Sequence, residues 1–174
     1  MYGQKNWIAL GLFALVSLPL ANGQEIPSTS DIAFDHPVLN TANVSVQFGM
    51  RTNPFTDKPR WHGGVDLVAP WDDPIYAPAE GVVVFAGTEA GWGKRVDLKV
   101  SDGWVLRFAH LKAFEVSEGD QISSGDVLGI IGSTGRATGP HVHLEALYNG
   151  KQYNPQDIET LTLYANARSS GLVE

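Results

Sequence analysis

The sequence predicts an all-β fold, for three reasons. The chain has 174 residues, 43% of them hydrophobic, which is enough for one globular domain and short for two. Nineteen glycines and ten prolines make turns frequent and long helices improbable. From residue 44 onward, short β-branched and aromatic runs alternate with Gly, Pro and Asp, a rhythm typical of antiparallel strands joined by tight turns.

The N-terminal residues have the pattern of an export signal. Lys5 precedes an apolar stretch over residues 7–21, which is shorter than the ~20 residues that span a bilayer and suits a secretory signal. Ala21 and Gly23 fit a cleavage site before Gln24. We therefore expect residues 1–23 to be removed, leaving an exported, periplasmic or extracellular protein with no stable membrane anchor. The alternative is an uncleaved anchor or a buried N-terminal helix.

The rest of the chain divides into three predicted parts. Residues 24–43 combine two prolines with turn-favouring residues and no sustained apolar period, so we expect a loose N-terminal arm. Residues 44–160 carry the strand rhythm and are the predicted domain. Residues 161–174 are the predicted C-terminal tail, and one helical turn is expected after Asn154-Pro155.

Within the domain, strands are expected at residues 75–77, 82–85, 96–100, 104–108 and 127–131. Residues 96–100 alternate strictly between apolar and polar side chains, and Asp102-Gly103 follows them. This combination predicts a β-hairpin over residues 96–108 with one solvated face. Two Gly-Asp turns, at 119–120 and 125–126, bracket a further short strand.

Charge and cysteine content exclude several classes of function. Twelve Lys and Arg against nineteen Asp and Glu give a net charge of −7, which argues against a nucleic-acid partner. The chain has no cysteine, so it has no disulfide, thiolate zinc finger, thiolate-held iron–sulfur cluster or cysteine nucleophile. Any bound metal must be held by His, Asp or Glu.

Four of the five histidines lie in distinctive settings, and the fifth, His36, is expected to be an ordinary polar residue. His141 and His143 are two residues apart on a predicted strand, so both project to one face, about 6.7 Å apart. His62 and Asp66 would be about 13 Å apart on an extended strand, but Gly63-Gly64 permits a bend that brings them together.

A site with these residues suits hydrolytic zinc chemistry. Two His or Asp ligands near the glycines and a third from elsewhere would leave one metal position open for water. His110 and His141 are then available as the base for the water's proton and as a donor to the developing oxyanion. Taken singly, each residue has an ordinary alternative: a core histidine, a chance pair on an exposed strand, or a turn-stabilising aspartate. The joint pattern favours the site.

The ordered motifs H-x-G-x-D, A-H-L and G-P-H-x-H-x-E resemble those of the lysostaphin/LytM-type zinc metalloendopeptidases of bacterial cell walls. The similarity runs from about Phe48 to Asn154-Pro155. It implies a small, strongly bent antiparallel β domain with a substrate groove. Two departures affect loops: Gly93-Lys94-Arg95 replaces a frequent Gly-Asn, and Asp72-Asp73 replaces a common Gly-Thr turn.

The resemblance also implies residue roles. It makes His62, Asp66 and His143 the ligands of one zinc ion, and it assigns His110 and His141 to the substrate and the attacking water, without saying which is the principal base. The implied reaction is hydrolysis of an amide in the stem peptides or cross-bridges of peptidoglycan, at the cell wall. Which cross-link is cut, and the oligomeric state, are not implied.

Several further residues have two interpretations. Glu145 shares the strand face of the two histidines, so it is either an acceptor for an imidazole N–H or a surface ion-pair partner. Large side chains in an all-β domain are usually core, but some could line a peptide groove; the candidates are Arg51, Trp61, Trp92, Trp104 and Tyr153. The arm at 24–43 could cover that groove.

Two other functions are compatible with parts of the pattern. One is a non-catalytic wall-binding or hydrolase-activating module of the same fold, which the complete ligand set disfavours. The other is a mononuclear iron oxygenase with two histidines and a carboxylate, although such sites commonly show H-x-D/E.

Overall fold

Strands account for nearly all the regular structure of the described residues, so the all-β prediction is confirmed. The structure is a computed structural model that describes residues 25–53 and 56–165, and the predicted export signal lies outside them. No helix in these ranges is long and apolar enough to cross a membrane. The strands are β1 (Asn43–Val46), β2 (Gly49–Thr52), β3 (Pro59–His62), β4 (Val65–Val68), β5 (Pro74–Tyr76), β6 (Gly81–Glu89), β7 (Gly93–Lys99), β8 (Trp104–Leu111), β9 (Ala113–Phe114), β10 (Gln121–Ile122), β11 (Val127–Ile130), β12 (Val142–Tyr148) and β13 (Lys151–Tyr153). A single 3-10 turn, η1 (Pro155–Asp157), follows Asn154 where one helical turn is expected.

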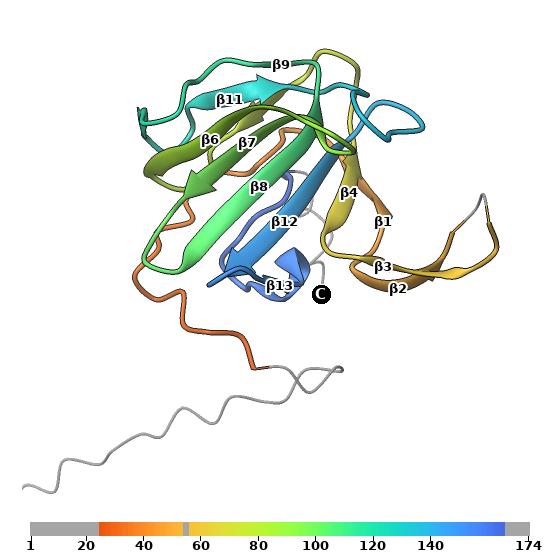
Figure 1. Cartoon of the computed structure of the whole chain (residues 1–174). Helices are drawn as coiled ribbons and strands as arrows, with labels where there is room; N and C mark the ends of the chain where they lie inside the picture. The colour runs from red at the N-terminus through yellow and green to blue at the C-terminus, as the bar shows by residue number, and fades with distance from the viewer. Residues whose placement is uncertain (1–24, 54–55, 166–174) are drawn as a thin grey trace, which may run out of the picture.

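The main sheet is antiparallel and has the order β1-β4-β12-β8-β7-β6-β10, with β13 paired to the end of β12 (Figure 1). A second sheet has the order β5-β11-β9, and β2 and β3 form a separate hairpin that projects from one side of the main sheet (Figure 1). The adjacent central strands β4, β12 and β8 carry side chains of the predicted site.

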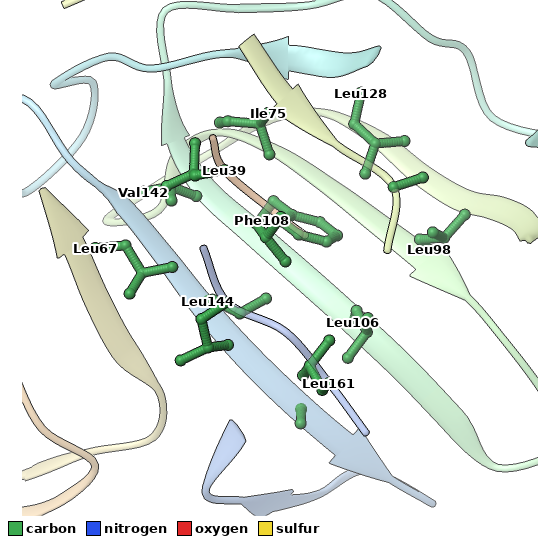
Figure 2. Close-up of a cluster of buried hydrophobic side chains, with 14 of the residues drawn as sticks. Leu39, Leu67, Ile75, Leu98, Leu106, Phe108, Leu128, Val142, Leu144 and Leu161 are labelled. Carbon is green, nitrogen blue, oxygen red and sulfur yellow. The ribbon is translucent and has the colours of Figure 1, made fainter. Parts of the chain in front are cut away.

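One face of the central strands builds the core. Phe108 of β8 and Val142 and Leu144 of β12 are fully buried there, as Figure 2 shows. Because side chains alternate along a strand, His143 and Glu145 of β12 point to the opposite face. One face of these strands therefore packs in the core, and the other carries the candidate site residues.

The predicted hairpin is present as β7 and β8, with Leu98 opposite Leu106. The predicted solvated face is exposed at Lys99, but it is buried at Asp97, which is 6% exposed, and at Arg95 just before the predicted hairpin, which is 8% exposed. Both are covered by ion pairs, Arg95 with Glu89 and Asp97 with Arg107. An alternating strand can thus bury its polar face when opposite charges meet across neighbouring strands.

The N-terminal arm is packed and not loose, contrary to the expectation from its composition. Leu39 is fully buried beside Val142 on the core face, and it forms a parallel bridge with Tyr164. Leu161 and Leu163 of the predicted tail are buried in the same cluster. Residues near both ends of the described chain therefore close the core together, on the face away from the histidines.

Truncating the arm's central side chain should destabilise the fold. We expect Leu39→Ala to lower the free energy of unfolding by about 2–5 kcal/mol, because it leaves a cavity among fully buried neighbours. Urea unfolding would measure the loss, and Val84→Ala is the control because Val84 is 42% exposed. Equal, small effects of both substitutions would contradict the packing role of the arm.

Candidate metal centre

The diglycine bend predicted between His62 and Asp66 separates β3 from β4. Gly64 presses against β12 so closely that a Cβ atom there would lie 2.1 Å from the carbonyl oxygen of Leu144. Glycine therefore allows the chain to turn directly against the sheet. The turn brings Nε2 of His62 to 3.0 Å from Oδ1 of Asp66.

β12 contributes the third predicted ligand. His143 pairs directly opposite Asp66 in the β4–β12 ladder. Its Nδ1 lies 2.7 Å from Oδ1 of Asp66 and 3.0 Å from Nε2 of His62. All three side chains are buried, and their ligand atoms form a group that could hold a metal ion.

Polar contacts outside this group orient the two imidazoles. The Nδ1–H of His62 donates to the carbonyl oxygen of Gln47 at 2.8 Å, which leaves Nε2 as an inward acceptor. Nε2 of His143 lies 3.4 Å from Oε1 of Glu145, which leaves Nδ1 facing inward. When neither imidazole carries an inward N–H proton, three acceptor atoms meet at the Asp66 carboxylate, an arrangement that a divalent cation satisfies.

The pKa shifts show the same preference for positive charge at this point. Burial raises the pKa of Asp66, but hydrogen bonds and charge interactions with His143 and His62 outweigh it and hold that pKa far below its usual range. Burial lowers the pKa of His143, but Asp66 and Glu145 outweigh it and raise that pKa. The Asp66 carboxylate thus stays ionised and stabilises positive charge at this point.

His110 reaches the same cavity through a β-bulge. Val96 pairs with Phe108 and Lys94 with Leu111, so β8 has one residue more than β7 at this point. His110 has a φ of 66°, which is unusual for a residue with a side chain. If side chains alternated strictly, His110 would point into the core with Phe108. The bulge instead turns His110 toward the opposite face of the sheet, which carries His143.

His110 and His141 lie side by side at the edge of the buried cluster, with ring centroids 4.9 Å apart. Their Nδ1–H groups donate to the carbonyl oxygens of Thr134 and Gly139, each at 2.8 Å, so Nε2 is the acceptor atom of each ring in its neutral form. Nε2 of His141 is 3.9 Å from Oδ1 of Asp66. Burial lowers the pKa of His110 to about 4, so this imidazole is neutral at neutral pH.

The sequence did not identify a charged row that supports His143. Asp97, Arg107 and Glu145 pair directly across β7, β8 and β12. Arg107 donates to Asp97 through Nη2 at 2.9 Å and to Glu145 through Nη1 at 3.1 Å. Glu145 is 1% exposed, so it is a buried neighbour of His143 and not a surface ion-pair partner. Each member is a polar residue between two core residues, but only strand register shows that they meet.

Neutralising Glu145 should weaken metal binding without removing a ligand. We expect Glu145→Gln to lower metal affinity by about 10- to 100-fold, because the carboxylate that faces Nε2 of His143 loses its charge. Competition with a chelator would measure the affinity. Glu118→Gln, in an exposed turn, is the matched control, and unchanged affinity in Glu145→Gln would reject the supporting role.

A cavity of about 430 Å³ opens over this cluster. Of the large candidates, Arg51, Trp61 and Trp92 line it, whereas Trp104 and Tyr153 are buried in the core. No described residue of the arm lines the cavity, so the arm does not cover it in this structure. The predicted groove thus lies on the side of the sheet that carries all four histidines of the motifs.

Comparisons with known proteins agree with this geometry. Residues 60–155 match the model of Peptidase family M23. DD-carboxypeptidase/endopeptidase Mpg of Neisseria meningitidis is 42% identical over 122 residues, covering 70% of this chain and 28% of that protein. Peptidoglycan DD-endopeptidase ShyC of Vibrio cholerae is 36% identical over 128 residues, covering 73% and 30%. The chain spans less than a third of the length of these two relatives.

The fold agrees as well. The catalytic domain of the antimicrobial peptidase lysostaphin from Staphylococcus simulans superposes with a TM-score of 0.60 at 27% identity, covering 66% of this chain and 90% of that domain. The resemblance stated from the motifs is confirmed. The chain belongs to Peptidase family M23.

Proposed function

We propose that the protein is a zinc-dependent peptidoglycan endopeptidase that hydrolyses an amide bond in the peptide cross-links of the bacterial cell wall. The observation that carries this proposal is the meeting of three inward ligand atoms, from His62, Asp66 and His143, beside the imidazoles of His110 and His141, whose Nδ1 atoms are held by backbone carbonyls. Peptidoglycan DD-endopeptidase ShyC supports the choice of substrate class.

The three ligand atoms fit one zinc ion per chain, since nitrogen and carboxylate oxygen without thiolate are typical of catalytic zinc sites. Zinc, when bound, supplies a Lewis acid that acidifies water and polarises the substrate carbonyl. Gln47 and Glu145 keep the ligand lone pairs directed inward, so the chain holds this geometry before substrate arrives.

His110 and His141 act on the substrate. Either neutral Nε2 can accept the proton of the attacking water, and the imidazolium formed can then donate to the tetrahedral oxyanion or to the departing amine nitrogen. Thr134 and Gly139 fix both rings by accepting their Nδ1–H groups. The positions of the rings, 4.9 Å apart, allow one to hold the water while the other contacts the scissile amide.

The proposal includes an export step and a domain division. Residues 1–23 would be the cleaved signal and residues 44–160 the catalytic domain, with 24–43 and 161–174 flanking it. The product would act in a periplasm or outside the cell, at the wall. Mass spectrometry of the N-terminus of secreted protein would locate the cleavage site.

The test is metal analysis of the purified protein together with its action on defined cross-linked muropeptides. We expect close to one zinc per chain and release of uncross-linked fragments, whose masses identify the cleaved bond. Bound zinc without cleavage would contradict the catalytic proposal and favour a wall-binding or hydrolase-activating module. Iron without zinc would favour an oxygenase.

A further inference from the structure

The described arginines fall into two groups. Arg95 and Arg107 form ion pairs with acidic residues. Arg51, Arg60 and Arg136 form no ion pair with any residue in 25–53 or 56–165, and all three line the cavity over the metal-ligand cluster. Arg60 and Arg136 are exposed and Arg51 is partly buried, so three arginines without an ion pair present positive charge to a ligand in this cavity.

The arrangement of two of them is unfavourable without an anion. Arg51 lies directly opposite Arg60 in the β2–β3 ladder, and like charges at such a position destabilise a hairpin. Nε of Arg51 is buried and has no hydrogen-bond partner in the described residues. An unsatisfied buried donor is costly, and a ligand that accepts its hydrogen bond would remove this cost.

The third arginine reaches the cavity from a distant part of the chain. Arg136 lies between β11 and β12, and its backbone N–H donates to the carbonyl oxygen of Gly91 at 2.9 Å. The hairpin and this loop therefore bring positive charge to one cavity from separate segments. The acidic residues that line it, Asp66 and Glu145, already contact His143.

We propose that Arg51, Arg60 and Arg136 form a carboxylate-binding subsite beside the metal-ligand cluster, and that the preferred substrate is a peptide with a free carboxylate near the scissile amide. A guanidinium binds a carboxylate through two parallel N–H groups, which fixes orientation as well as charge. That the ligand is a cell-wall peptide rests on the proposed function. The carboxylate has two possible sources, the C-terminus of the peptide or a carboxylate that branches from its stem.

The experiment measures binding separately from cleavage. The probes are three otherwise identical muropeptides: one unmodified, one with its C-terminal carboxylate converted to a carboxamide, and one with its stem carboxylates converted. Calorimetric titration of each into the zinc-loaded His110→Ala protein reports affinity without turnover. We expect one of the two modified peptides to bind at least about tenfold more weakly than the unmodified peptide. The peptide that does so identifies the source of the carboxylate.

Arginine variants then assign the effect to the subsite. Arg51→Gln and Arg136→Gln, in the same His110→Ala protein, should lower affinity for the unmodified peptide by about tenfold. Neither substitution should change affinity for the carboxamide peptide that binds the parent protein more weakly. Lys58→Gln, which removes a charge from the same hairpin outside the cavity lining, should change neither. Zinc content equal to that of the parent protein shows that the site is folded.

Two results would overturn the subsite. One is equal affinity of the parent protein for all three peptides. The other is an equal loss on the unmodified and amidated peptides in the glutamine variants, which would show a merely structural role. Failure of wild-type protein to cleave any peptide would contradict the endopeptidase proposal and would leave these binding comparisons valid.

Discussion

Replacing His143 with alanine is expected to abolish stoichiometric metal binding, and hydrolysis with it. The Nδ1 atom of His143 lies within 3.0 Å of both other candidate ligand atoms, so its removal leaves only two protein ligands, on the consecutive strands β3 and β4. The loss should exceed the 10- to 100-fold change typical of residues that only support a ligand. Metal content after dialysis and turnover of cross-linked muropeptides would both be measured.

His36→Ala is the matched control for this experiment. His36 donates through Nδ1 to the carbonyl oxygen of Pro37, packs its ring at a tilt against Tyr76 and does not line the cavity. Its removal should leave zinc content and turnover unchanged. A His143→Ala protein that kept one zinc per chain would show that the assignment of His62, Asp66 and His143 as the ligand set is incorrect.

Replacing His110 with alanine should have the opposite signature, with zinc retained and turnover lost. Because His110 is not one of the three converging ligands, metal affinity should remain close to that of wild type. General acid–base catalysis by one side chain typically contributes 10²- to 10⁴-fold, so we expect a fall in kcat in that range with a smaller change in KM. Metal analysis and steady-state kinetics on the same preparation would separate these effects.

The corresponding His141→Ala variant completes the comparison. Comparing the two losses in kcat ranks the contributions of His110 and His141 to the reaction, which the sequence left open. His110→Ala with normal turnover would exclude His110 from the reaction, and His110→Ala without zinc would assign it to metal binding instead.

The local part of the site could be predicted from the sequence because it depends on short-range geometry. Alternation on a strand places His141 and His143 on one face, and both line the cavity. The Gly63-Gly64 pair permits the bend that brings His62 to Asp66, and the structure has that bend. Each relation spans at most five residues, so strand periodicity and glycine conformational freedom were sufficient.

Other features depended on pairings between distant strands. The row of Asp97, Arg107 and Glu145 exists only because β7, β8 and β12 pair in one register, and the bulge at His110 is a mismatch between two strands. The burial of Leu39 likewise requires a partner 125 residues away, at Tyr164.

The sequence by itself therefore determined the all-β class, the family and the side chains able to bind a metal ion, because residue type and local spacing determine these. Only the tertiary structure decided which carboxylate supports His143, how His110 turns into the cavity, that the arm closes the core, and that three arginines share one cavity. The physical reason is that register and long-range packing are set by the free energy of the whole folded chain.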